Sequence, residues 1–187
     1  MLNAAANPPF HILSSLRADQ PHPAYQEKLM LFGQFIGVWD MDIKFFDESG
    51  RTIFHSPGEW SFSWVLDGRA IQDVITYADL SDAAKNSPGE RRTGTTLRYY
   101  DPRLDVWRVI FLGATSGILI LLTGGLVGEE IWIEGMEANG TLNRWMFTNI
   151  TRDSFHCKGL ASTDNGVTWR PEQEMLARRR ATGELSR

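Results

Sequence analysis

Most of the chain after Gly33 alternates apolar and polar residues with a period of two, which is typical of β-strands that bury one face. The alternation is clearest where Trp60, Phe62 and Trp64 are separated by serines, and Trp39, Met41, Ile43 and Phe45 repeat it earlier. We expect about ten strands, at residues 34–46, 51–66, 69–79, 92–100, 105–113, 116–124, 127–136, 141–150, 154–163 and 167–179.

The segments between these strands are short and rich in Gly, Asp, Asn and Pro, the residues that turns require. Because a parallel crossover takes roughly a dozen residues or more, the short connections predict antiparallel neighbours. The pattern therefore favours an all-β fold, an antiparallel up-and-down β-barrel, whose closure removes exposed sheet edges. A β-sandwich is the alternative, although no long connection of the Greek-key type is evident.

The beginning of the chain follows a different pattern. Several prolines and little periodicity predict an irregular start, and residues 24–32 form the expected short helix because Tyr25, Leu29 and Phe32 can share one helical face. We divide the chain into an N-terminal segment with a short helix at 1–33, a barrel at 34–179 and a C-terminal tail at 180–187.

Composition excludes several classes of function. A length of 187 residues with 42% hydrophobic residues suits one domain with a sizeable core. The net charge of -4 offers no broad positive field, which disfavours a nucleic-acid partner. The single Cys157 fits a reducing compartment, and the N-terminus does not resemble a signal peptide. The longest apolar run is about half the ~20 residues that a membrane-spanning helix needs, so we expect a cytoplasmic protein with no membrane partner.

Gly37 and Trp39 form a Gly-x-Trp on the first expected strand, directly after the expected helix. This arrangement resembles the opening of the calycin superfamily, which includes lipocalins and fatty-acid-binding proteins. In that superfamily the Trp closes one end of the barrel and a late Arg packs over it, so the resemblance implies that Arg179, with Arg178 as the alternate, packs over Trp39. The segments at 59–74, 94–107, 144–155 and 164–169 are also similar to uncharacterised bacterial lipocalin-like proteins, which supply no established catalytic motif.

A ten-strand barrel is wide enough to hold more than its own side chains. About eight strands leave an interior that side chains just fill, or that holds one small ligand, and additional strands widen it. A cavity with aromatic walls and a few polar groups is the usual form of a small-molecule site. The inward aromatics could instead simply fill the core. The residues that we expect to bind a ligand are Trp60, Trp64, Gln72, Arg98, Tyr100, Trp132 and Asn149.

Two orientations stay open on the sequence alone. Strand parity does not decide whether Gln72 or Asp73 points inward. Arg98 lies in an otherwise apolar strand, where an inward guanidinium would need a carboxylate or an anionic ligand. The alternative is an outward Arg98 that lies along the barrel wall.

We expect binding of a small, mostly hydrophobic molecule in the barrel. The alternative is a cofactor-independent isomerase, cyclase or hydrolase in which Asp73, Glu130 or Glu134 acts as acid and base, because burial favours the protonated carboxyl group. A third possibility is a structural module with a filled barrel. No cofactor and no metal are expected, since the histidines are scattered and Cys157 has no partner cysteine. A haem-ligating role for His156 is less favoured than a surface position.

Apolar residues occupy both faces of the strands at 106–112 and 118–122. The outer surface there therefore needs a cover, which could be the N-terminal segment or a second subunit. We favour a homodimer.

Overall fold

The computed structural model describes residues 16–78 and 91–181. Among these residues are a 3-10 helix η1 (Pro23–Tyr25), the helix α2 (Gln26–Gly33) and ten strands. The strands are β1 (Gly37–Phe46), β2 (Thr52–Val65), β3 (Ala70–Ala78), β4 (Arg91–Asp101), β5 (Val106–Gly113), β6 (Ile118–Val127), β7 (Glu130–Met136), β8 (Leu142–Thr148), β9 (Ser154–Ser162) and β10 (Arg170–Arg179). Residues 1–15 of the expected N-terminal segment and 182–187 of the expected C-terminal tail lie outside the described residues.

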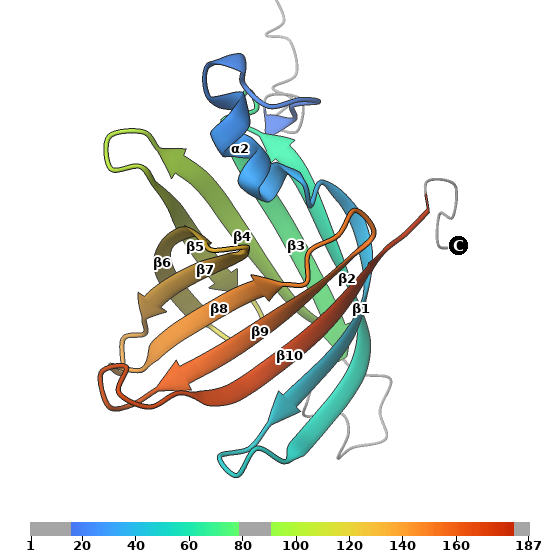
Figure 1. The fold of residues 1–187 in the computed structure, drawn as a ribbon. Coiled ribbons are helices and arrows are strands. Elements are labelled where there is room, and N and C mark those ends of the chain that lie inside the picture. Colours follow the sequence, from blue (N-terminus) through green and yellow to red (C-terminus); the bar gives the residue numbers. More distant parts are fainter. Residues whose placement is uncertain (1–15, 79–90, 182–187) are drawn as a thin grey trace, which may run out of the picture.

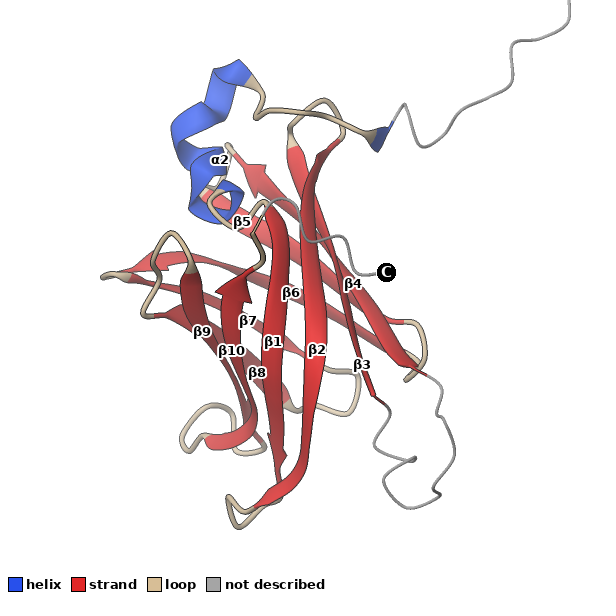
Figure 2. Cartoon of the chain, turned by 90° about the vertical axis from the view of Figure 1, so that its right-hand side faces the viewer, coloured by secondary structure: helices blue, strands red, loops and turns tan. Residues whose placement is uncertain are grey.

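The ten strands form one closed antiparallel barrel. Each strand pairs with the next along the chain, and β10 returns to pair with β1. Figures 1 and 2 show the strands winding around a common interior, with α2 across one end. The predicted up-and-down barrel with a short N-terminal helix is confirmed, and the sandwich alternative is wrong because the sheet closes on itself. Among the described residues, no helix is both long and apolar enough to cross a membrane.

The alternation in the sequence becomes the inside and the outside of this barrel. On β1, Trp39, Met41 and Ile43 are buried, whereas Asp40 and Asp42 are exposed. Cross-strand register preserves the division, because Ile43 lies opposite Met175 of β10 and Trp39 lies opposite Trp60 of β2. Residues that are paired across neighbouring strands point to the same face of a sheet, so each inward side chain meets other inward side chains.

Aromatic rings fill the end of the barrel that α2 covers, which we call the helical end. Phe32 of α2 and Phe35, which follows it, are almost completely buried. The ring of Phe35 lies with its centroid 5.3 Å from that of Phe147 and 4.8 Å from that of Phe155. Phe32 packs edge-on against Phe147 at 5.8 Å. The interior is therefore closed at this end by side chains from the helix and from strands far apart in the sequence.

Trp39 and Arg179 meet at the helical end. The guanidinium carbon of Arg179 lies 4.0 Å from the centroid of the Trp39 ring. Arg179 also donates hydrogen bonds of 2.7 Å to the carbonyls of Gln34, Ile36 and Arg152, and Trp39 Nε1 donates to the carbonyl of Phe35 at 2.7 Å. These contacts tie the segment between α2 and β1 to the end of β10.

The turn between β9 and β10 is held by the carboxylate of Asp164. Its oxygens accept hydrogen bonds from the Thr168 amide at 2.9 Å, from the Thr168 hydroxyl at 2.6 Å and from the Ser162 hydroxyl at 2.7 Å. Because these bonds, led by that from the Thr168 hydroxyl, favour the ionised form, the pKa of Asp164 is lowered to about 2. The carboxylate charge thus contributes to the stability of this turn.

Candidate functional site

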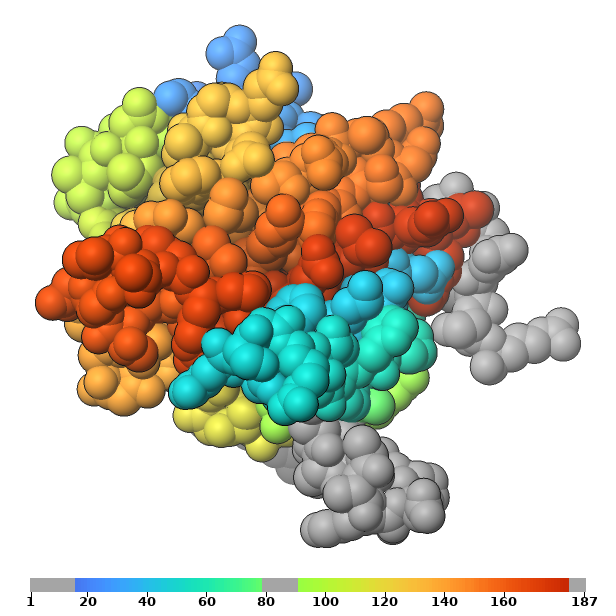
Figure 3. Space-filling model, turned by 60° about the horizontal axis from the view of Figure 1, so that its bottom comes forward, coloured from blue at the N-terminus to red at the C-terminus, as the bar shows by residue number. Residues whose placement is uncertain are grey.

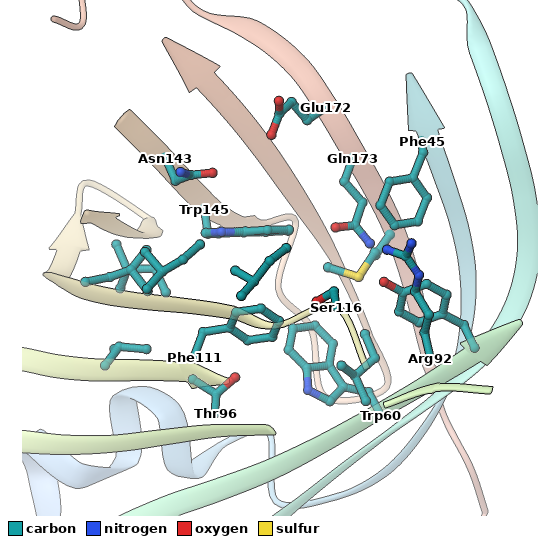
Figure 4. A pocket seen from close by; sticks show the side chains of 18 of the residues that line it. Phe45, Trp60, Arg92, Thr96, Phe111, Ser116, Asn143, Trp145, Glu172 and Gln173 are labelled. Atoms are coloured by element: carbon teal, nitrogen blue, oxygen red, sulfur yellow. The ribbon is translucent and has the colours of Figure 1, made fainter. Parts of the chain in front are cut away.

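The barrel contains a cavity of about 350 Å³ between the aromatic filling of the helical end and the opposite end. Its walls are mainly aromatic and aliphatic, because the alternation of each strand places apolar side chains inside. Figure 4 shows Asn143 and Trp145 on one side of the cavity and Phe45 and Arg92 on the other. The chief apolar residues of the wall are Phe45, Trp60, Ile75, Tyr77, Val109, Phe111, Ile120, Leu122, Ile133, Trp145, Phe147 and Met175.

As far as the described residues define it, the cavity opens at the end of the barrel opposite α2, which we call the open end. Several lining residues lie at strand ends or turns there, including Phe46, Ser116 and Glu137. Figure 3 looks toward this end, where the β1–β2 turn appears in cyan and the β9–β10 turn in orange-red. Within the described residues, the cavity is therefore bounded by side chains at the helical end and by strand ends and turns at the open end.

The floor of the cavity carries a buried ion pair. Arg98 of β4 is 2% exposed and Asp73 of β3 is 1% exposed. Asp73 Oδ2 pairs with Arg98 Nη1, and Asp73 Oδ1 accepts a hydrogen bond of 2.7 Å from Trp60 Nε1. Arg98 lines the cavity, whereas Asp73 lies behind it and does not. The carboxylate therefore fixes the position of the guanidinium from the side away from the cavity.

The surroundings of Arg98 are otherwise apolar. Its guanidinium carbon lies 5.3 Å from the centroid of the Phe32 ring and 5.5 Å from that of the Phe62 ring. Burial lowers the pKa of Arg98 to about 9, which leaves it charged near neutral pH, and the contact with Asp73 favours the same charged form. Arg98 Nε is buried and has no hydrogen-bond partner among the described residues.

The structure resolves both orientations that the sequence left open. Asp73 points inward, and Gln72 lies on the outer face, where its amide donates to the Thr95 hydroxyl at 3.1 Å. Arg98 points inward with the carboxylate partner that burial requires. Of the ligand-binding residues expected from the sequence, Trp60 and Arg98 line the cavity.

Trp64 and Tyr100 share the inward face but lie at the helical end. Trp64 packs so closely under α2 that a Cβ atom on Gly33 would lie 2.6 Å from its ring. The Tyr100 hydroxyl donates to Asp105 Oδ1 at 2.6 Å, and Lys28 Nζ lies 5.6 Å from the centroid of its ring. Neither side chain reaches the cavity.

Trp132 lies on the outer face, between the buried inward residues Ile131 and Ile133. The Arg144 guanidinium stacks between the rings of Trp132 and Trp169, with its central carbon 4.8 Å and 4.0 Å from their centroids. Glu130 accepts from Trp132 Nε1 at 2.7 Å, and Glu134 pairs with Arg144. Trp132, Glu130 and Glu134 therefore do not line the cavity, contrary to the expected inward position of Trp132.

Asn149 and His156 also lie away from the cavity. Asn149 is exposed in the turn after β8, with a positive φ of 48° that ends the strand. His156 faces outward from β9, and its Nε2 pairs with Glu174 Oε1 at 2.7 Å. Within the described part of the chain, no group of three His, Cys, Asp or Glu side chains is arranged to hold a metal ion.

Sequence reasoning missed several polar residues of the cavity. Thr96, Asn143 and Gln173 line it, together with Ser116 at the open end. Thr96 lies two residues before Arg98 and Asn143 two residues before Trp145, so strand parity alone would have placed both of them inside. They were overlooked because a small polar side chain in a strand is equally common on the outer face.

No protein-family model matches this chain, and no curated protein matches it significantly. Among solved structures, the S-type phycobiliprotein lyase CPES from Guillardia theta is similar with a TM-score of 0.55 and 10% identity, over 82% of this chain and 92% of that chain. A de novo designed fluorescence-activating β-barrel matches with a TM-score of 0.39 and 12% identity, over 79% of this chain and 95% of that one. EF1p2_mFAP2b bound to DFHBI matches with a TM-score of 0.40 and 10% identity, over 82% and 99%. At 10% identity the likeness to the lyase concerns the fold alone.

Proposed function

We propose that this protein binds a small, mostly hydrophobic molecule inside the barrel. The observation that carries the proposal is the cavity of about 350 Å³, walled mainly by aromatic and aliphatic side chains. Its volume lies within the ~300–1,000 Å³ of typical small-molecule sites. A structural module with a filled barrel is disfavoured, because close packing leaves few voids larger than a water molecule in a protein interior.

The lining suits a flat ligand with few polar groups. Trp60, Phe111 and Trp145 offer ring faces, and burial of apolar surface contributes roughly 25 cal/mol per Å² removed from water. Arg98 at the floor and Asn143 and Gln173 higher on the wall are the polar groups that would orient the molecule. In such a site the apolar walls supply most of the affinity, and the few polar groups fix the orientation of the ligand.

An enzyme that uses Asp73 as acid and base is the weaker alternative. A general base must come within hydrogen-bond reach of the proton that it takes, directly or through one water. Asp73 is 1% exposed, and its two oxygens already contact Trp60 and Arg98. We therefore assign Asp73 the role of positioning Arg98 rather than of reacting with a substrate.

We also propose a relationship to the calycin superfamily and a homodimeric, cytoplasmic protein. The contact of Trp39 with Arg179 supports the relationship to the calycin superfamily.

The exposed apolar residues of β6 support the homodimer. Leu119 and Leu121 are 58% and 64% exposed, and Leu121 lies opposite Met136, which is 54% exposed. A second copy would bury this outer face. Sedimentation at micromolar concentration should show a dimer, and a monomer alone would contradict this proposal.

Titration with 1-aminoanthracene, a neutral tricyclic fluorophore, tests the binding proposal. Two substitutions on β6 form a matched pair, because Leu122 lines the cavity and is 3% exposed, whereas Leu121 points outward and is 64% exposed. Leu122→Trp should fill the cavity and weaken binding at least tenfold, while Leu121→Trp should leave the dissociation constant unchanged. Circular dichroism checks that both variants are folded. Equal affinity in all three proteins would refute binding in the barrel.

A further inference from the structure

The charges at the floor of the cavity balance one another. Of the described residues that line the cavity, Arg92, Arg98, Glu137 and Glu172 are charged, and only Arg98 lies at the floor. Glu137 accepts a hydrogen bond of 2.8 Å from Asn143, and Glu172 pairs with Arg170 at 2.8 Å, both near the open end. The inner part of the cavity therefore sees the Arg98 cation together with the Asp73 anion that neutralises it.

Arg98 nevertheless has a hydrogen-bond donor to spare. Nη1 forms the ion pair with Asp73 Oδ2, and Nε is buried with neither an ion-pair contact nor a hydrogen-bond partner among the described residues. A buried donor without an acceptor is unfavourable, so this N–H is a site for an oxygen or nitrogen acceptor of a bound molecule. A ligand without an acceptor at its inner end would leave this donor unpaired.

We propose that the ligand is a neutral apolar molecule with a carbonyl-type acceptor at its inner end, and that the cavity discriminates against carboxylates; this rests on the proposed binding function. A neutral carbonyl can accept from Arg98 Nε and adds no charge. A carboxylate at the same place would be a second anion beside Asp73, in surroundings where both are desolvated and like charges repel strongly. The ion pair thus supplies a directed donor without a net positive charge.

Three naphthalenes of similar size test this selectivity in the wild-type protein. 2-Acetylnaphthalene has a neutral carbonyl, 2-naphthoate has a carboxylate that is ionised at neutral pH, and 2-ethylnaphthalene has no acceptor. Competition against 1-aminoanthracene gives each dissociation constant. We expect 2-acetylnaphthalene to bind at least tenfold more tightly than either of the others. A carboxylate that binds as tightly as the ketone, or more tightly, would overturn the proposal.

Asp73→Asn should reverse the preference. The substitution keeps an amide oxygen that can accept from Trp60 but removes the negative charge, which leaves Arg98 as an uncompensated cation. We expect 2-naphthoate to bind this variant at least tenfold more tightly than 2-acetylnaphthalene does. Asp67→Asn is the control, because Asp67 is 84% exposed in a turn at a positive φ of 57° that Asn accepts. The order of affinities should not change in this control, and an unchanged order in folded Asp73→Asn would also overturn the proposal.

The outcomes separate the selectivity from the binding function itself. If all three naphthalenes bind equally, the barrel binds apolar molecules and only the proposed selectivity is wrong. If none of the naphthalenes binds and 1-aminoanthracene does not bind either, the proposed function fails and the selectivity fails with it. If Asp73→Asn does not fold, the comparison of the ketone with the carboxylate in the wild type decides.

Discussion

Replacing Trp39 with Ala should destabilise the barrel strongly. The Trp39 ring is completely buried, and its Nε1 donates to the carbonyl of Phe35 at 2.7 Å. Loss of a buried Trp side chain costs about 3–5 kcal/mol in transfer and cavity energy. The lost contact with Arg179 and the unpaired carbonyl of Phe35 add to this cost. Because these contributions overlap in part with the loss of the side chain, we expect a total of about 4–6 kcal/mol.

Urea denaturation followed by circular dichroism measures this change. For a domain of this length each kcal/mol shifts the melting temperature by roughly 2–4 °C, so a thermal scan should show a decrease of roughly 8–24 °C. Trp132→Ala is the matched control, because it removes the same side chain from the outer face, where the ring is half-buried against Arg144. We expect about 1 kcal/mol there. An unchanged midpoint in Trp39→Ala, or equal losses in the two variants, would refute the role given to Trp39.

Three further predictions concern stability. Gly37 has a φ of 127°, so Gly37→Ala should lower the free energy of unfolding by about 1–3 kcal/mol, measured by thermal unfolding. Gly125→Ala is the control and should cost less, because the added methyl group meets no described atom within 4 Å. The pKa of Asp164 in the folded protein is lowered from the ordinary value of 3.8 to about 2, so the carboxylate charge stabilises the fold fully at pH values above 3.8. The difference in melting temperature between the wild type and Asp164→Asn should therefore decrease as the pH falls from 3.8 toward 2. A difference that stays constant over this range would argue against a stabilising charge on Asp164. Arg98→Met should cost about 3–5 kcal/mol in urea, and Asp73→Leu combined with Arg98→Met should recover most of that loss; a double variant as unstable as the single one would contradict the ion-pair explanation.

The barrel could be predicted from the sequence because its signals are local. Each strand has its own alternation, and each turn has its own Gly, Asn or Asp, so ten antiparallel strands follow without knowledge of distant contacts. Closure follows from the need to cover two sheet edges. The contact between Trp39 and Arg179 was predicted from the resemblance to the calycin superfamily, because no local pattern relates two residues so far apart in the sequence.

The cavity lining could be predicted only in part, because parity gives the face of a strand and not the depth along the barrel. Trp64 and Tyr100 share the inward face with Trp60 and Arg98, yet they lie at the helical end, where α2 and the aromatic rings fill the interior. The depth to which side chains fill the barrel depends on the position of α2 at the helical end. The alternation within a strand carries no information about that position.

The outer position of Trp132 has a different cause. In β7 the apolar residues Ile131, Trp132 and Ile133 are consecutive, so parity allowed either face. The two isoleucines turn inward, and the Trp ring is covered outside by Arg144 and stays half-buried. A long cationic side chain can thus shield an aromatic ring on a barrel surface, which makes an outer Trp appear interior in the sequence.

A crystal structure of the protein with bound 1-aminoanthracene would locate the site directly, because the interior cavity and the exposed leucines of β6 are both apolar enough to attract the probe. We predict density for the probe inside the barrel, between Trp60 and Trp145 and above Arg98. Density on the outer face beside Leu119 and Leu121, with the barrel interior unchanged, would contradict the assignment of the cavity as the binding site.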